Sequence, residues 1–375
     1  MSGISTNSIH AADEVHKVAD VMTPIHVTTT YKYDDDPEKL IKDEDLPENS
    51  IIGNVVYSRE TNPNSERVEK ILDSILDGHT VAYTSGLAAF FAALTYFNPK
   101  VASIGKGYHG CHGILNIFSR LKGLKQISLE DDLSQLNAGD LICLETPVNP
   151  DGTVFDIQYY ADKAHERGAF LLVDSTFAPP PLQDPFKWGA DMVFHSATKY
   201  FGGHSDLLAG VLATKDINVK NQLVKDRVDL GSNISNLESF LLIRSLRTYE
   251  LRILKQAENA EKLIKFLVDN REKYPKLKKI YHSSLQTEPF VRKQLSNGYS
   301  PVFCIELECE ADAKHFPSKL RYFHHATSLG GVESLIEWRV LSDSTVSPTL
   351  LRLSVGVENI DDLIADVDQG LKSVA

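Results

Sequence analysis

Short apolar runs alternate with segments of helical periodicity through the middle of the chain, and this alternation limits the possible folds more than any other feature. Short apolar runs of this kind are typical of buried strands. Strands are expected at 101–104, 126–129, 141–144, 170–173, 192–194 and 208–213, and helices at 114–121 and 157–167. This order of elements predicts a parallel α/β sheet covered by helices, with ligands bound at the carboxyl ends of the strands.

Polar residues follow four of these runs, at the edge of the sheet where ligands are expected. They are the clusters 107–110 and 145–150, together with Asp174 and Lys199. A strand-end lysine and a strand-end aspartate are what a pyridoxal-phosphate enzyme needs. The lysine holds the aldehyde as a Schiff base, and the aspartate pairs with the protonated pyridine nitrogen, so that the ring can act as an electron sink. Taken alone, Lys199 is more often a solvated surface residue.

Other segments could supply further contacts to such a cofactor. Ser85 and Gly86 precede an alanine-rich helical run, and a helix N-terminus with a hydroxyl forms a phosphate seat. Tyr108 could stack on the pyridine ring, and Asn149 could hydrogen-bond the ring hydroxyl. Each has a simpler interpretation: Ser85 as a helix N-cap, Tyr108 as a packed aromatic residue and Asn149 as a turn residue before proline.

Composition excludes several other classes of protein. The chain has 375 residues and a formal net charge of −12, which argues against binding to nucleic acid or to an anionic membrane. It contains no apolar run of 18 residues and no Cys-x-x-Cys pair among its four cysteines, so a soluble cytoplasmic protein is expected. His109 and His112 have no third ligand close by, so no metal site is expected.

The pattern changes twice along the chain and divides it into three parts. Residues 1–60 are expected to form an N-terminal arm, residues 61–245 the α/β domain and residues 246–375 a smaller α+β domain. A long helix over 235–269 is expected to link the two domains. In the last part Arg352 lies within an apolar strand, at 351–355. A buried arginine is costly unless it meets an anion, so Arg352 is a candidate for binding a substrate carboxylate. A structural ion pair with a nearby glutamate is the alternative.

These segments together resemble the transsulfuration (Cys/Met metabolism) family of pyridoxal-phosphate enzymes. The resemblance runs from about residue 9 to residue 369. The segments that carry it are Tyr57-Ser-Arg59, Ser85-Gly86-Leu87, 145–150, Val173-Asp174-Ser-Thr176, the stretch from Ser196 through Thr198 and Lys199 to Asp206, Ser328-Leu-Gly-Gly-Val-Glu333, and Arg352-Leu-Ser.

The resemblance implies the type I fold of pyridoxal-phosphate transferases and a role for each matching residue. Lys199 would carry the cofactor and later move protons, while Asp174 and Tyr108 would contact the ring. Further cofactor contacts are implied for Ser85, Gly86, Leu87, Asn149, Thr176, Ser196 and Thr198, and substrate contacts for Ser328, Glu333 and Arg352. Tyr57 and Arg59 would reach the cofactor phosphate of a neighbouring subunit, which implies at least a homodimer and favours a tetramer.

The resemblance also implies a reaction. The substrate would be a sulfur amino acid of the cystathionine type, and the context of Glu333 favours elimination or replacement at Cγ, as in a γ-lyase or γ-synthase. Cystathionine β-lyase or cysteine-S-conjugate β-lyase chemistry is the alternative. Thr61, Ser175 and Cys111 depart from the usual family pattern, which motivates a minor alternative, a non-catalytic regulatory protein with the same fold.

Overall fold

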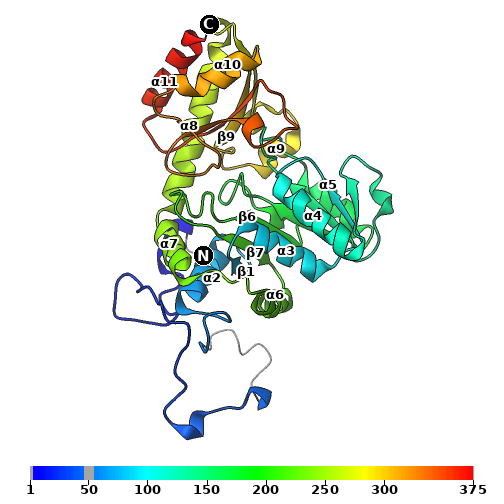
Figure 1. Cartoon of the computed structure of the whole chain (residues 1–375), viewed down its shortest axis with the longest axis vertical. Coiled ribbons are helices and arrows are strands. Elements are labelled where there is room, and N and C mark those ends of the chain that lie inside the picture. The colour runs from blue at the N-terminus through cyan, green and yellow to red at the C-terminus, as the bar shows by residue number, and fades with distance from the viewer. Residues whose placement is uncertain (1–2, 46–54, 375) are drawn as a thin grey trace.

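The computed structural model describes residues 3–45 and 55–374, so residues 46–54 of the expected N-terminal arm lie outside the described part. The described chain is built around two β-sheets, and the long helix α8 (Tyr249–Asp269) runs from one to the other. Figure 1 shows the larger sheet in the middle of the molecule and the smaller sheet near the C-terminus, with the N-terminal segment extending away from both.

The larger sheet has seven strands in the order β1-β7-β6-β5-β4-β2-β3. Their bounds are β1 His79–Tyr83, β2 Val101–Ile104, β3 Lys125–Ser128, β4 Leu141–Glu145, β5 Phe170–Asp174, β6 Met192–Ser196 and β7 Gly210–Thr214. All neighbouring pairs are parallel except those that β7 makes with β1 and β6. The predicted α/β class, with a mostly parallel sheet, is therefore confirmed.

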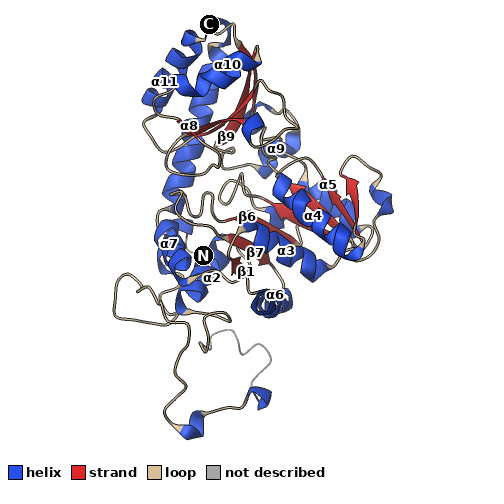
Figure 2. Ribbon diagram, in the orientation of Figure 1, coloured by secondary structure: helices blue, strands red, loops and turns tan. Residues whose placement is uncertain are grey.

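Helices cover both faces of this sheet, as the ribbon in Figure 2 shows. On one face lie α3 (Gly86–Phe97), α4 (His109–Lys122) and α6 (Ile217–Leu230). The other face is covered by α2 (Pro63–Ile75), α5 (Ile157–His165) and α7 (Asn236–Leu246). Neighbouring residues of β5 alternate between the two cores: Leu171 and Val173 pack on the second group of helices and Leu172 on the first. Because both faces are buried, the strand is apolar without a break.

The smaller sheet has five strands in the order β10-β11-β12-β9-β8, and only β10 and β11 run parallel. The strands are β8 Leu277–Tyr281, β9 Val302–Leu307, β10 His324–His325, β11 Leu335–Trp338 and β12 Leu350–Ser354. The accompanying helices are α9 (Pro289–Gln294), α10 (Glu310–His315) and α11 (Ile360–Ser373). A separate core joins the sheet to the second half of α8 and to α11. We propose domain boundaries near residues 60 and 246, because α8 enters this core.

The sequence predicted one helix over 235–269, and this was wrong. The structure divides it into α7 and α8 at Arg247 and Thr248. The guanidinium of Arg252 donates to the Ser245 carbonyl at 2.9 Å and to the Tyr200 carbonyl at 2.8 Å. The Ser245 carbonyl also accepts from the Thr248 backbone N–H at 3.2 Å, so the break tightens the end of α7 and Arg252 adds a second donor there. Strands β1, β10 and β11 were not predicted either.

The N-terminal segment contributes one helix, α1 (Ile4–His10), which packs beside α2 and α8. Beyond it the described chain has little regular structure up to α2, and several of its apolar side chains are exposed, including Val21, Val27 and Tyr33. No described helix combines the length and the apolar character that a membrane span needs.

Candidate active site

Most of the predicted site residues line a single cavity of about 490 Å³ at the carboxyl ends of β4, β5 and β6. These residues come from both domains: Ser85, Gly86, Leu87, Tyr108, Asn149, Asp174, Thr176, Ser196, Thr198, Lys199, Ser328 and Arg352. The parallel arrangement explains why they meet, since the ends of adjacent parallel strands lie at the same edge of a sheet. Glu145 and Asp174, for example, are direct cross-strand neighbours.

Three predicted residues do not line this cavity. Tyr57 is 42% exposed on the N-terminal segment, and the guanidinium carbon of Arg59 lies 5.6 Å from the centre of its ring. Glu333 accepts a hydrogen bond from the Ser205 hydroxyl. The single chain therefore places Tyr57, Arg59 and Glu333 outside the cavity wall.

Lys199 lies in the turn that follows β6, and its amine points to the smaller domain. Its Nζ donates a hydrogen bond to the Ser328 hydroxyl at 2.8 Å. Burial lowers the pKa of the Lys199 amine to about 8; the nearby positive charge of Arg352 lowers it further, and the charge of Glu337 opposes the shift. An amine with this pKa is partly neutral near neutral pH, so it can act as a nucleophile and as a base.

Asp174 ends β5 and is held by Thr176. The Thr176 backbone N–H and hydroxyl both donate to Oδ1 of Asp174, at 2.9 and 2.6 Å, and the Thr176 hydroxyl accepts from the Ser196 backbone N–H at 2.9 Å. Among the described residues no partner reaches Oδ2. Burial raises the pKa of Asp174, which is the usual effect on a carboxylate that lacks a nearby cation.

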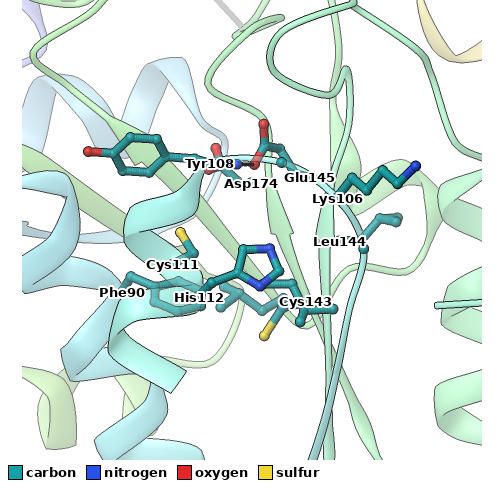
Figure 3. Close-up of a pocket in the computed structure, with 13 residues that line it drawn as sticks. Phe90, Lys106, Tyr108, Cys111, His112, Cys143, Leu144, Glu145 and Asp174 are labelled. Atoms are coloured by element: carbon teal, nitrogen blue, oxygen red, sulfur yellow. Dashed lines mark hydrogen bonds between the residues drawn. The ribbon is translucent and has the colours of Figure 1, made fainter. Parts of the chain in front are cut away.

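Glu145 shapes the wall next to Asp174. Its two carboxylate oxygens accept hydrogen bonds from the backbone N–H groups of Tyr108 and Asn149, each at 2.7 Å. Burial, together with the neighbouring charge of Asp174, raises the pKa of Glu145. Figure 3 shows Tyr108 and the carboxylates of Glu145 and Asp174 at a small hollow that Cys111 and His112 also line.

The N-terminus of α3 closes another side of the cavity. The Ser85 hydroxyl accepts from the Ala88 backbone N–H at 3.1 Å, so the predicted N-cap role is present. The first N–H groups of a helix have no intrahelical acceptor, and in α3 these belong to Gly86 and Leu87. A side chain at Gly86 would meet Ser196, because its Cβ would lie 3.2 Å from the Ser196 hydroxyl. The helix end and the hydroxyl of Ser196 therefore lie side by side, which is an arrangement that can hold an anion.

Arg352 is buried in β12 and has partners in both domains. Its guanidinium donates to Asn149 Oδ1 at 2.8 Å, to the Ser328 carbonyl at 2.9 Å and to Glu337 Oε2 at 2.7 Å. The structural ion pair considered as an alternative therefore exists, with Glu337 as the partner. Arg352 lines the cavity as well, so an ion pair with Glu337 and a contact with a substrate carboxylate do not exclude each other.

Sequence reasoning gave no role to several residues of the wall, above all Glu145, His109, Arg339 and Ser342. Glu145 falls in a segment that was noted only as a polar cluster. Arg339 directly follows an apolar run, much as Arg352 lies within one. Because burial of a guanidinium is costly without an anion, this position could have indicated Arg339 as a candidate site residue. Within the described residues, no group of three or more His, Cys, Asp or Glu side chains could hold a metal ion.

A sequence profile of the family described as Cys/Met metabolism PLP-dependent enzyme matches residues 5–372. The chain belongs to this family. It is therefore an enzyme that uses pyridoxal phosphate. Cystathionine gamma-lyase of Saccharomyces cerevisiae is 34% identical over 98% of this chain and 97% of its own length. Cystathionine gamma-synthase of Escherichia coli is 33% identical over 94% of this chain and 93% of its own length. Cystathionine beta-lyase of Lactococcus lactis is 33% identical over 99% of this chain and 100% of its own length.

Solved structures of this family have the same fold. Cystathionine gamma synthase from Xanthomonas oryzae, in complex with aminoacrylate and cysteine, aligns with a TM-score of 0.88 at 29% identity and covers 100% of this chain and 99% of that one. Cystathionine gamma-lyase from Lactobacillus plantarum gives 0.88 at 28% identity, with the same coverage. The expected pyridoxal-phosphate type of fold is thereby confirmed.

The geometry of the cavity fits this cofactor. The cavity is lined by the N-terminus of α3, by Lys199 with its lowered pKa and by Asp174 with its raised pKa. The carboxyl group of Asp174 would be stabilised as an anion by a cationic donor, which a protonated pyridine nitrogen supplies.

Proposed function

We propose that this enzyme acts on sulfur amino acids of the cystathionine type and catalyses elimination or replacement at Cγ, as a γ-lyase or a γ-synthase. The observation that carries the proposal is the hydrogen bond between Lys199 Nζ and the Ser328 hydroxyl, 2.8 Å long. It puts a partly neutral amine between the residues that fit the cofactor and Arg352, which fits a substrate carboxylate. The relatives named as γ-lyase and γ-synthase support this choice of reaction.

Each residue then has a physical task. Lys199 would carry the cofactor, and Gly86, Leu87, Ser196 and Thr198 would bind its phosphate, while Ser85 caps the helix. Bound pyridoxal phosphate supplies an electron sink for negative charge at the substrate Cα. Asp174, which is fixed by Thr176, would accept a hydrogen bond from the protonated ring nitrogen, and Tyr108 would cover the ring. Asn149 contributes to the ring contacts and orients Arg352.

On the substrate side, Arg352 binds the α-carboxylate and Ser328 orients the Lys199 amine. Loss of a sulfur group from Cγ requires removal of a proton from Cβ as well as from Cα. Lys199 Nζ would move both protons once the substrate amine has replaced it on the cofactor, and the proton from Cβ would go to the departing sulfur. Since deprotonation requires the neutral amine, the lowered pKa of Lys199 favours the step. Glu333 is proposed to contact substrate only after Ser205 or the surrounding loop changes position, because in this structure it bonds to Ser205.

The proposal extends to assembly and location. Tyr57 and Arg59 lie away from the cavity of their own chain, so we propose that they complete the cavity of a second subunit in a homodimer or a tetramer. The four cysteines are free, which supports the cytoplasm as the compartment.

The test is identification of the product. The purified holoenzyme is incubated with cystathionine, and separately with cysteine and an O-acylated homoserine. Release of 2-oxobutyrate or formation of cystathionine supports reaction at Cγ. Release of pyruvate from cystathionine would instead establish the second candidate, a β-lyase, which the 33% identical Lactococcus enzyme favours.

Lys199→Ala tests the role of the amine in the same assay. It should lower turnover at least about a thousandfold, because removal of a catalytic group that acts with a cofactor leaves little residual rate. Lys255→Ala is the matched control, since Lys255 is a surface residue paired with Glu258. Normal turnover by Lys199→Ala would contradict the mechanism.

A further inference from the structure

A second arginine lines the same cavity as Arg352 and has no assigned task. Arg339 follows β11, is 4% exposed, and lines the cavity together with Ser342. Its guanidinium donates to Glu337 Oε2 at 2.8 Å and lies 3.8 Å from Asp343. Within the described part of the chain, Nε of Arg339 has no hydrogen-bond partner although it is buried.

Glu337 links the two arginines. It lies directly opposite Arg352 across β11 and β12, and a single oxygen, Oε2, accepts from both guanidinium groups. The distance between the donating nitrogens of Arg339 and Arg352 therefore cannot exceed the sum of these two hydrogen-bond lengths. A carboxylate buried at this point holds both guanidinium groups in place before any ligand arrives.

This end of the cavity has hydrogen-bond donors to spare, although its charges are balanced. Glu337 and Asp343 together match the charges of Arg339 and Arg352, but Asp343 lies 3.8 Å from Arg339, beyond hydrogen-bond length. Hydrogen bonds from Thr345 and the charges of Arg339 and His109 outweigh burial and keep the pKa of Asp343 below its ordinary value. His109 also lines the cavity. With an α-carboxylate on Arg352, the N–H groups of Arg339 that do not bond to Glu337 would be available to a second acid.

We propose that Arg339 is a second anion-binding residue of the substrate pocket, which binds an acidic group on the substrate side chain while Arg352 binds the α-carboxylate. The proposal rests on the function proposed above and narrows its substrate class. The preferred substrates are amino acids whose leaving group ends in a carboxylate, whether that group is joined through a thioether or an ester. Glu337 is a positioning residue in this arrangement, because it acts through the two arginines.

The kinetic test compares two thioethers of similar length that release the same keto acid by elimination at Cγ. S-carboxymethyl-L-homocysteine ends in a carboxylate, and S-ethyl-L-homocysteine ends in a methyl group. Arg339→Gln should lower kcat/KM for the charged substrate about tenfold to a hundredfold, mainly through KM, and should change the neutral one less than about threefold. Arg339→Lys should be intermediate, since it keeps the charge and loses the planar fork.

The same comparison is made with two esters, O-succinyl-L-homoserine, which ends in a carboxylate, and O-acetyl-L-homoserine, which does not. It shows whether the preferred leaving group is joined through an ester rather than a thioether. Discrimination that depends on Arg339 in either pair supports the proposal. An equal loss for charged and neutral substrates, or no loss for either, would overturn it. Arg321→Gln is the control, because Arg321 is exposed and lies outside the cavity.

A binding measurement separates this proposal from the proposed function, because it needs no turnover. Glutarate and butyrate are titrated calorimetrically into the holoenzyme and into the Arg339→Gln holoenzyme. The dicarboxylate should bind the unmodified enzyme about tenfold more tightly than the monocarboxylate, and the variant should lose this difference. If all the amino acids above fail to react but the difference in binding is found, the proposed reaction is wrong and Arg339 is still an anion-binding residue. Equal binding of the two acids to the unmodified enzyme would refute the role of Arg339.

Discussion

At the scale of single residues, burial and a few neighbouring charges determine what the cavity can do. The same loss of water lowers the pKa of Lys199 and raises the pKa of Asp174, so each group is less charged than it would be in solution. Both shifts suit a site that is completed by a ligand with complementary charge. The carboxylate gains a cationic partner from the ring nitrogen, and the amine becomes reactive near neutral pH.

The Lys199 pKa predicts how the apoprotein captures its cofactor. Only the neutral amine attacks an aldehyde, so the initial rate of pyridoxal-phosphate uptake should rise with pH and level off above a midpoint near 8. Absorbance recorded after mixing at several pH values measures this rate. Arg352→Gln should move the midpoint to higher pH, since the charge of Arg352 lowers the amine pKa. A midpoint near the ordinary lysine value of 10.5 would contradict the described environment.

At the scale of elements, strand ends and one helix N-terminus bring the residues together. The apolar runs of β4, β5 and β6 could be predicted from sequence because both faces of the sheet are buried. Their polar ends could be predicted to share an edge because adjacent parallel strands end at the same edge of a sheet. Contacts between the sheet domain and the smaller domain could not be predicted, because the bonds of Arg352 to Asn149 and to Glu337 depend on how distant segments pack. Arg339 was missed although the apolar residues before it indicate a buried guanidinium, and β1 was missed because His79 and Thr80 interrupt its apolar pattern.

The approach of α3 to β7 gives a prediction at this scale. A Cβ at Gly210 would lie 2.1 Å from the Ser85 carbonyl oxygen, so Gly210→Ala should push the N-terminus of α3 out of place. We expect a loss of about 1–3 kcal/mol in the free energy of unfolding and weaker cofactor binding. Thermal unfolding and cofactor titration measure the two effects.

The matched control is Gly113→Ala in the exposed part of α4, where a Cβ would meet nothing within 4 Å. This change should stabilise the protein by about 0.5–1 kcal/mol, because alanine favours the helix. Equal behaviour of the two variants would show that the contact between α3 and β7 does not matter.

At the scale of the whole molecule, the long helix α8 connects the two cores, and the cavity lies where residues of both domains meet. The N-terminal segment exposes apolar side chains and carries Tyr57 and Arg59 away from the cavity. An exposed apolar segment of this kind is typical of a surface that another chain covers. The sequence indicated such an arm, but its packing partner could not be derived from one chain.

Shared sites predict complementation between inactive subunits. Lys199→Ala and the double variant Tyr57→Ala, Arg59→Ala are co-expressed with different affinity tags, and the hybrid oligomers are isolated on both tags. Each hybrid dimer should contain one intact cavity, with Lys199 from one subunit and Tyr57 and Arg59 from the other. About half of the activity of the unmodified dimer is expected. Inactive hybrids, with each parent also inactive, would show that the residues do not act across subunits.

The most direct test of the whole account is to find which residue carries the cofactor. Borohydride reduction fixes pyridoxal phosphate to the lysine that holds it, and peptide mass mapping then identifies the modified residue. The label should be found on Lys199 and should be absent from Lys199→Ala. A label on a different lysine, or none in a protein saturated with cofactor, would contradict it.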